Sequence, residues 1–146
     1  MSNKYLKIDL VTDEITKIDL LKNDRNNWYN SSKVGYVSCF ESNINYDYYC
    51  LGTYSQQIFL IDRKTDKSIC SLPVVHTNGV NKLLCLKTHP NMFLSGARKD
   101  NYIYLWDTRN LSNPVNNYTR SNDIYQKLNF CLDISEEILF CGNKVN

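Results

Sequence analysis

The sequence predicts an all-β fold made of repeated four-stranded blades, the architecture of a β-propeller. Short runs of apolar, β-branched and aromatic residues alternate along the chain with Gly, Asn and Asp turn residues, which is the pattern of consecutive antiparallel strands. Landmark residues also recur at intervals of 44 or 45: Gly35 and Gly79, Gly52 and Gly96, Asp62 and Asp107. This interval is the period expected of four-stranded propeller blades.

Residues 1–34 are predicted to be the last strands of a preceding blade and a loop. Two short strands, Tyr5 to Leu10 and Thr16 to Leu21, are joined by a turn that contains Asp9-x-x-Thr12-Asp13. The same spacing returns in Asp62-x-x-Thr65-Asp66, which indicates the same kind of turn in the next blade. A polar, asparagine-rich segment from Lys22 to Lys33 contains Trp28 and is interpreted as an inserted surface loop.

Residues 35–78 are predicted to be a complete blade with strands at Gly35 to Phe40, Tyr48 to Thr53, Gln57 to Asp62 and Lys67 to Leu72. Ile61 stands where the next blade has a Trp, and no His precedes the first strand. We expect this blade to be held by packing alone.

Residues 79–123 form the second predicted blade, and residues 124–146 begin a truncated one. Strands are expected at Val80 to Leu86, Met92 to Gly96, Tyr102 to Asp107 and around Val115 to Tyr118, followed by Lys127 to Leu132 and Ile138 to Cys141. The sequence thus predicts two complete blades with partial blades at both ends. A closed propeller needs at least about four blades, so this interpretation implies a piece of a longer protein or a truncated gene model.

Four residues of the second blade have the spacing of a polar network that ties turns to strands. Ser95-Gly96 is followed by Asp100, and Trp106-Asp107 comes six residues beyond that Asp, which resembles the third strand of a WD-repeat blade. In such blades a His in the preceding loop bonds the turn Asp, while a Ser and the Trp indole complete the network. His76 lies where that loop is expected. The predicted hydrogen-bond tetrad is His76, Ser95, Asp100 and Trp106, and its role is structural.

Composition limits the function classes only weakly. The chain has 146 residues and a formal net charge of +2, which is too small to identify a nucleic-acid binder. No Cys-x-x-Cys pair suggests a metal site, no cofactor motif is present, and the N-terminus lacks the apolar segment of a secretion signal. We expect an intracellular protein whose cysteines, mostly in strand-like runs, are buried free thiols: Cys39, Cys50, Cys70, Cys85, Cys131 and Cys141.

Residues 35–142 resemble one WD-repeat family, the telomerase Cajal body protein family. The similarity is most specific in the hairpin Ser95-Gly96-Ala97-Arg98-Lys99-Asp100 with Trp106-Asp107, and weaker in Gly35-x-x-Ser38-Cys39, Tyr49-Cys50-x-Gly52-Thr53-Tyr54 and Gln126-Lys127-Leu128-x-Phe130. The resemblance implies a nuclear, non-enzymatic scaffold that binds small Cajal-body RNAs and telomerase RNA, with ribonucleoprotein proteins as further partners.

The candidate binding residues are expected near one rim of the blades, where the loops before the first strand and between the second and third strands open. A cluster of basic residues and tyrosines suits single-stranded RNA, because guanidinium and ammonium groups bind phosphate and tyrosine rings stack on unpaired nucleobases. Arg98 and Lys99 are the first choice because Ser, Asp or Gly is commoner in such a turn. The full set of RNA- or partner-binding candidates is Arg98, Lys99, Tyr54, Tyr118, Arg120 and Lys127.

Two other classes of function remain open at this stage. A rim of basic residues and tyrosines also suits protein partners, so a protein-interaction scaffold without direct RNA binding is the alternative. A thiol–imidazole pair, Cys85 with His89 or Cys70 with His76, would be the basis of an enzyme. Neither pair has a third partner in the sequence, which argues against catalysis.

Overall fold

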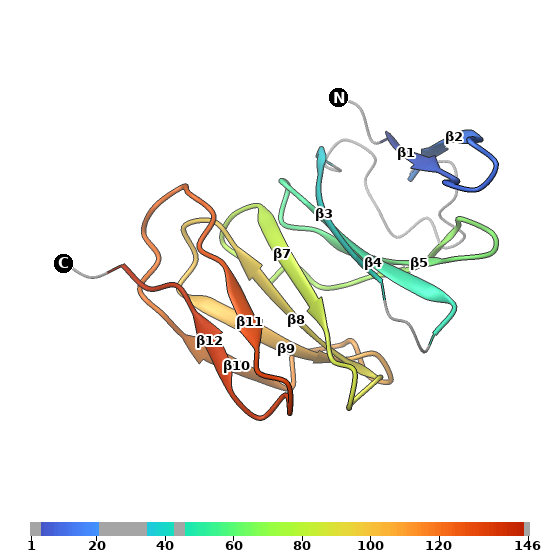
Figure 1. The fold of residues 1–146 in the computed structure, drawn as a ribbon. Helices are drawn as coiled ribbons and strands as arrows, with labels where there is room; N and C mark the ends of the chain where they lie inside the picture. The colour runs from blue at the N-terminus through green and yellow to red at the C-terminus, as the bar shows by residue number, and fades with distance from the viewer. Residues whose placement is uncertain (1–3, 21–34, 43–45, 145–146) are drawn as a thin grey trace.

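The structure is a computed structural model that describes residues 4–20, 35–42 and 46–144. Within these ranges the chain forms twelve β-strands and no helix (Figure 1). The strands are β1 (Lys4–Ile8), β2 (Ile15–Asp19), β3 (Val37–Ser42), β4 (Tyr48–Thr53), β5 (Ile58–Asp62), β6 (Ser68–Ser71), β7 (Val80–Cys85), β8 (Met92–Ala97), β9 (Tyr102–Asp107), β10 (Asn116–Thr119), β11 (Phe130–Leu132) and β12 (Leu139–Cys141). The predicted all-β fold is confirmed.

Two antiparallel four-stranded sheets form the body of the molecule, β3-β4-β5-β6 and β7-β8-β9-β10. In both sheets, strands that follow one another in the sequence are also neighbours in the sheet. The two-stranded sheets β1–β2 and β11–β12 lie at opposite ends of the row (Figure 1). The structure therefore has two complete blades with a partial blade on either side, as predicted. The loop that contains Trp28 lies outside the described residues.

The recurring Asp turn has the same geometry in two sheets. At the end of β1 and again at the end of β5, the Asp side chain accepts hydrogen bonds from the backbone N–H groups two and three residues further on, at 2.7–3.0 Å. Asp9 and Asp62 make these contacts. Asp13 and Asp66 then take left-handed backbone conformations, with φ of 56° and 53°. Asp and Asn tolerate this conformation better than most residues, which explains why the spacing repeats.

The core consists of three apolar clusters, one between each pair of successive sheets. The first joins β1–β2 to β3–β6, the second joins the two complete blades, and the third joins β7–β10 to β11–β12. Their most buried members are respectively Leu51 and Ile61, Val80 and Trp106, and Ile103 and Phe130. Face-to-face packing of sheets is thus the main source of stability.

Two glycines let each blade approach the next. A Cβ atom placed on Gly52 would lie 2.8 Å from a methyl carbon of Val80 in β7, and one placed on Gly96 would lie 2.7 Å from the ring of Phe130 in β11. Distances this short are not tolerated between carbon atoms. The 44-residue glycine spacing therefore marks equivalent close contacts with the first strand of the following sheet.

The expectation that the β3–β6 blade is held by packing alone needs correction. The Thr53 hydroxyl is buried and accepts a hydrogen bond of 3.1 Å from the Gln57 backbone N–H. The Ser38 hydroxyl donates to the Gly52 carbonyl oxygen at 3.0 Å and also bonds the Val80 carbonyl oxygen. Hydrogen bonds in the β4–β5 turn, between β3 and β4, and from β3 to the next blade thus accompany packing.

Candidate functional site

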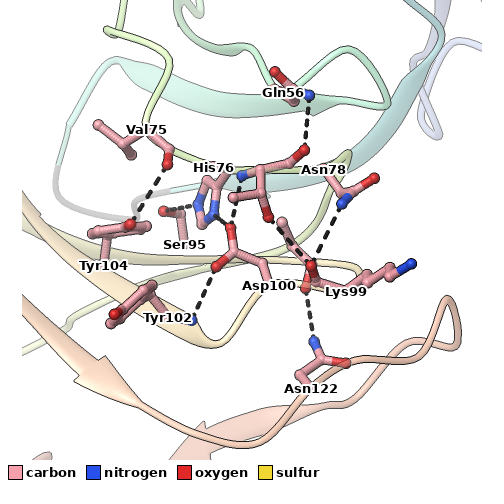
Figure 2. Close-up of polar contacts among 12 residues, drawn as sticks. Gln56, Val75, His76, Asn78, Ser95, Lys99, Asp100, Tyr102, Tyr104 and Asn122 are labelled. Carbon is pink, nitrogen blue, oxygen red and sulfur yellow. Dashed lines mark hydrogen bonds and ion pairs between the residues drawn. The ribbon is translucent and has the colours of Figure 1, made fainter.

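His76, Ser95, Asp100 and Trp106 form a continuous chain of hydrogen bonds in the second blade. The Nδ1 of His76 lies 2.9 Å from a carboxylate oxygen of Asp100, and its Nε2 lies 2.8 Å from the Ser95 hydroxyl. The Trp106 indole N–H donates to the same hydroxyl at 2.8 Å. All four residues are buried, so the network is shielded from water. Figure 2 shows His76 between Ser95 and Asp100.

The network fixes both loops at this end of the blade. The Asp100 carboxylate also accepts hydrogen bonds from the backbone N–H groups of Thr77 and Tyr102, each at 3.0 Å. It thereby connects the loop before β7 to the turn between β8 and β9 (Figure 2). The ring of Tyr104 packs edge-on against His76, with 4.9 Å between the ring centres. These contacts hold the loops that carry the rim residues.

The charge of Asp100 is maintained by its partners. Burial disfavours the ionised carboxylate and opposes the shift, but the hydrogen bonds from His76, Tyr102 and Thr77 prevail, so the pKa of Asp100 lies below its usual range. The carboxylate is therefore an acceptor at neutral pH. This is the form that the backbone N–H donors require.

The turn between β8 and β9 presents Arg98 and Lys99, each beside a tyrosine ring. The Arg98 guanidinium carbon lies 4.4 Å from the ring centre of Tyr54, and the Lys99 ammonium lies 4.9 Å from that of Tyr125. Tyr54 belongs to the preceding blade, whereas Tyr125 precedes β11. Each cation–π pair therefore joins the β8–β9 turn to a neighbouring blade or to the loop that leads to it. The structure thus brings three of the predicted rim residues together: Tyr54, Arg98 and Lys99.

The backbone of Lys99 is held in an uncommon conformation. Its φ is 47°, in the left-handed region. Its N–H donates to the Ile124 carbonyl oxygen at 3.0 Å, and its own carbonyl oxygen accepts from the side chains of Thr77 and Asn78. These bonds offset the conformational cost and fix the direction in which Lys99 leaves the turn.

Arg120 was predicted to be an exposed residue of the rim, but its side chain is buried, and this prediction is corrected. Its guanidinium donates to the carbonyl oxygens of Leu128 and Ala97, at 3.0 and 3.4 Å, and lies over the ring of Phe130. Burial lowers the pKa of Arg120, but the group remains a cation. Its place next to Gly96 gives it a structural role between the second blade and β11.

Tyr118 and Lys127 follow the Arg98–Lys99 turn in the sequence and belong to other elements of the structure. Tyr118 is on the outer strand β10, where it pairs with Ile103 and is exposed. Lys127 is exposed and precedes β11, close enough to Cys39 to influence its thiol. No described contact joins either of them to Tyr54, Arg98 or Lys99.

Two residues at this end of the blade were missed in the sequence. Tyr125 forms the pair with Lys99 described above. Asn122 is buried and donates to the Ala97 carbonyl oxygen at 3.0 Å, and its backbone N–H donates to the Asn101 side chain at 2.8 Å. Both follow β10 in a loop of polar residues that gives no periodic signal. Their position before the next blade, equivalent to that of His76, was the available clue.

The described cysteines and histidines form neither a metal site nor a nucleophile–base pair. In the described ranges, no group of three His, Cys, Asp or Glu side chains could hold a metal ion. His76 uses both ring nitrogens in the tetrad, and His89 bonds the Thr88 hydroxyl. The pKa of Cys39 is raised to about 11, mainly because the thiol is buried, so this thiol is unreactive at neutral pH. Cys131 and Cys141 are exposed, contrary to expectation, because their two-stranded sheet has an open side.

The repeated four-stranded sheets and the tetrad together define the class of protein: the chain is part of a WD-repeat β-propeller. Over 109 residues it is 31% identical to telomerase Cajal body protein 1 of Bos taurus, 32% identical to that of Mus musculus and 30% identical to that of Homo sapiens. The predicted resemblance to the telomerase Cajal body protein family is confirmed.

The similarity covers 75% of this chain but only 20% of each of these relatives. The chain therefore spans about a fifth of the length of the curated relatives it matches. No protein-family model matches the chain. No helix suited to crossing a membrane is found in the part of the chain that the structure describes.

Proposed function

We propose that this chain is part of a non-enzymatic WD-repeat scaffold that binds small Cajal-body-type RNA and telomerase RNA during ribonucleoprotein assembly or trafficking in the nucleus. The names of its relatives support the telomerase and Cajal-body association. Within the chain, the observation that carries the proposal is the pairing of Arg98 with Tyr54 and of Lys99 with Tyr125 at one end of the blades.

The rim offers both kinds of contact that single-stranded RNA uses. Lys99 and Tyr125 are exposed and Arg98 is partly exposed, so cations and ring faces are accessible together. The Nε of Arg98 is buried and has no hydrogen-bond partner within the described part of the chain. Stacking uses the face of a guanidinium and leaves its N–H edge for a phosphate oxygen. We expect phosphate contacts from Arg98 and Lys99 and base stacking on the tyrosines.

The test is a double variant, Arg98→Ala with Lys99→Ala, measured for binding to structured small RNA at several salt concentrations. Removing two phosphate contacts should weaken binding and reduce the log–log salt slope by about 1.4, at roughly 0.7 per contact to a single strand. The matched control is Lys64→Ala with Lys87→Ala, which removes the same charge from exposed turns at the opposite ends of the strands. That control should leave the slope unchanged.

A protein-interaction scaffold without RNA binding predicts a different outcome. The chain would then bind structured small RNA no better than bulk RNA, and the rim variant would match its control in affinity and salt slope. Circular dichroism of each variant verifies that the β-sheet structure is retained. Equal binding by a folded rim variant would remove the RNA proposal at this site.

A further inference from the structure

Residues 120–125, at the start of the connection from β10 to β11, run alongside the β8–β9 turn. At one end of this segment, the Arg120 backbone N–H donates to the Asn101 carbonyl oxygen at 2.7 Å. At the other end, the Ile124 carbonyl oxygen accepts a hydrogen bond from the Lys99 backbone N–H at 3.0 Å. The segment is thus attached to the turn that carries the rim cations.

Asn122 attaches the middle of the segment to both sides of the same turn. Its backbone N–H donates to the side-chain oxygen of Asn101 at 2.8 Å, after the turn. Its side-chain amide donates to the Ala97 carbonyl oxygen at 3.0 Å, before the turn. Figure 2 shows the Asn122 side chain pointing toward the turn that contains Lys99 and Asp100. A single residue therefore bonds the chain on both sides of the Arg98–Lys99 pair.

The opposite side of the segment is held by residues that follow β12. The Ser121 backbone N–H donates to the Asn143 side chain at 2.6 Å, and the Ser121 carbonyl oxygen accepts from the Lys144 N–H at 3.0 Å. The Lys144 ammonium also lies 2.7 Å from a carboxylate oxygen of Asp123. The segment is therefore fixed from two sides along most of its length.

Tyr125 is the last residue of the segment, and its place depends on the path of the segment. Its ring centre lies 4.9 Å from the Lys99 ammonium, and the residue is 64% exposed. An exposed side chain on an irregular loop samples many positions unless its backbone is fixed. A ring that is already in place binds a nucleobase without a further loss of conformational entropy.

Asn122 itself is not a contact residue for RNA, because it is only 1% exposed. Its side-chain oxygen has no hydrogen-bond partner in the described part of the chain. A buried polar atom in this state lowers stability, so an apolar side chain would suit the packing better. The amide is therefore better explained by what its N–H group holds than by the stability that it adds.

We propose that Asn122 is a positioning residue of the RNA site, which holds the 120–125 segment against the β8–β9 turn and so keeps Tyr125 beside Lys99. This inference rests on the proposed function, since it assigns to Asn122 the preorganisation of one half of that site. The Arg98–Tyr54 pair joins the turn to the preceding blade. Asn122 should therefore act on the Tyr125 half of the rim alone.

The first measurement is the affinity for structured small RNA in a cycle of Asn122→Ala and Tyr125→Ala. Tyr125→Ala should weaken binding about 5- to 150-fold, the range expected for one base–aromatic stack. Asn122→Ala should weaken binding at least about threefold, because a looser segment lowers the fraction of molecules in which Tyr125 is in place. The double variant should bind no more weakly than Tyr125→Ala, since Asn122 acts through that ring. Additive losses would overturn the proposal.

Two controls separate positioning from a general loss of structure. Asn122→Ala and Tyr54→Ala should have additive effects on affinity, because Tyr54 belongs to the other half of the rim. Glu136→Ala removes a contact between the same two sheets at the opposite ends of the strands, where the carboxylate accepts from the Lys87 and Thr88 N–H groups at 2.7 and 2.8 Å. This variant should bind RNA like the wild type. A loss as large as that of Asn122→Ala would mean that the sheets are merely loosened, and would overturn the positioning role.

The second measurement is made by NMR without RNA. Protons above an aromatic ring are shifted by its ring current, so the side-chain methylene protons of Lys99 next to the ammonium report the Tyr125 contact. Tyr125→Ala abolishes this shift and gives the reference. Asn122→Ala should bring the Lys99 resonances close to that reference, whereas Glu136→Ala should leave them in place. Asn101→Ala, at an exposed position, removes one acceptor of Asn122 and should have an intermediate effect, which keeps the test valid if Asn122→Ala does not fold.

The two measurements distinguish failure of this inference from failure of the proposed function. A wild-type chain that does not bind structured small RNA would remove the proposed function, and with it the positioning role. Lys99 resonances that stay in place in both Asn122→Ala and Asn101→Ala would overturn the positioning role alone, even where the wild type binds RNA.

Discussion

The β3–β6 and β7–β10 blades share one topology, but different side chains pack each of them against the preceding sheet. Both have four strands in sequential order and an irregularity near the start of the first strand. The second blade places Ser95 and Trp106 on the face toward its predecessor, whereas the first places Leu51 and Ile61 at the corresponding positions. All four residues are fully buried or nearly so.

The difference shows what a buried polar network contributes. An apolar pair such as Leu51 and Ile61 stabilises by removing surface from water and tolerates small changes of shape. A chain of hydrogen bonds depends on the orientation of its groups and so fixes relative positions. Here His76 and Asp100 connect two loops that apolar contacts alone would leave loosely placed. Its cost is that loss of one member leaves the others buried and unpaired. The two blades should therefore respond differently to substitution.

The largest expected effect is that of Leu51→Ser, which introduces the hydroxyl of the second blade into the first. There is no imidazole or indole in the described surroundings of Leu51 to bond it. Loss of the buried side chain should lower the free energy of unfolding by about 2–5 kcal/mol, measured by urea denaturation. Leu51→Met is the control and should cost much less. Equal stability of the Ser and Met variants would mean that this position accepts a polar group.

The next effect is that of Asp100→Ala, which removes the acceptor of three hydrogen bonds. The buried imidazole and two backbone N–H groups lose their partner, at a cost of about 1–3 kcal/mol. Asp62→Ala removes the Asp at the end of β5, in a turn of the blade without the tetrad. Its effect on the unfolding midpoint should be smaller. A variant of Asp100 as stable as the wild type would show that the network contributes nothing net.

The lowered pKa of Asp100 also predicts that the free energy of unfolding depends on pH. Because its pKa is lowered in the folded chain, its contribution to stability is present above the unfolded carboxyl pKa of about 3.9 and is lost as the pH falls through the folded value. The difference in unfolding free energy between the wild type and Asp100→Asn should be constant from pH 7 to about 5 and shrink below about pH 4. A difference that is independent of pH down to 3 would indicate that the folded pKa is not lowered.

The fold was predictable because its signals are local and repeated. Glycines that allow one sheet to approach the next, and Asp turns that close hairpins, must recur with every blade, so the spacing of Gly52 and Gly96 or of Asp9 and Asp62 shows in the sequence. The bonds that supplement packing in the first blade had no such signal. Thr53 and Gln57 bond each other across a single turn, and many Thr and Gln residues lie in turns without doing so.

The candidate rim was less predictable because it depends on contacts between blades. The repeat spacing placed Arg98 in a turn but did not reveal Tyr125, whose ring reaches Lys99 from the loop between β10 and β11. Arg120 follows a short outer strand and has the sequence context of an exposed cation. Only the structure shows that Gly96 opens a space for its guanidinium beside Phe130. Burial of a charged residue depends on such long-range space, which sequence spacing does not record.

The smallest expected effect concerns the Arg98–Tyr54 pair, which connects the two compared blades at the rim. The guanidinium lies 4.4 Å from the ring centre, and Tyr54 is 47% exposed, so solvent weakens the attraction. A double-mutant cycle with Arg98→Ala and Tyr54→Ala should give a coupling energy of about 0.5–1 kcal/mol. Lys99→Ala is the control for Tyr54, because Lys99 stacks on a different ring, and its coupling to Tyr54 should be near zero. If Arg98 couples to Tyr54 no more than Lys99 does, the two blades are held together by their buried cluster and Arg98 is free to turn toward a ligand.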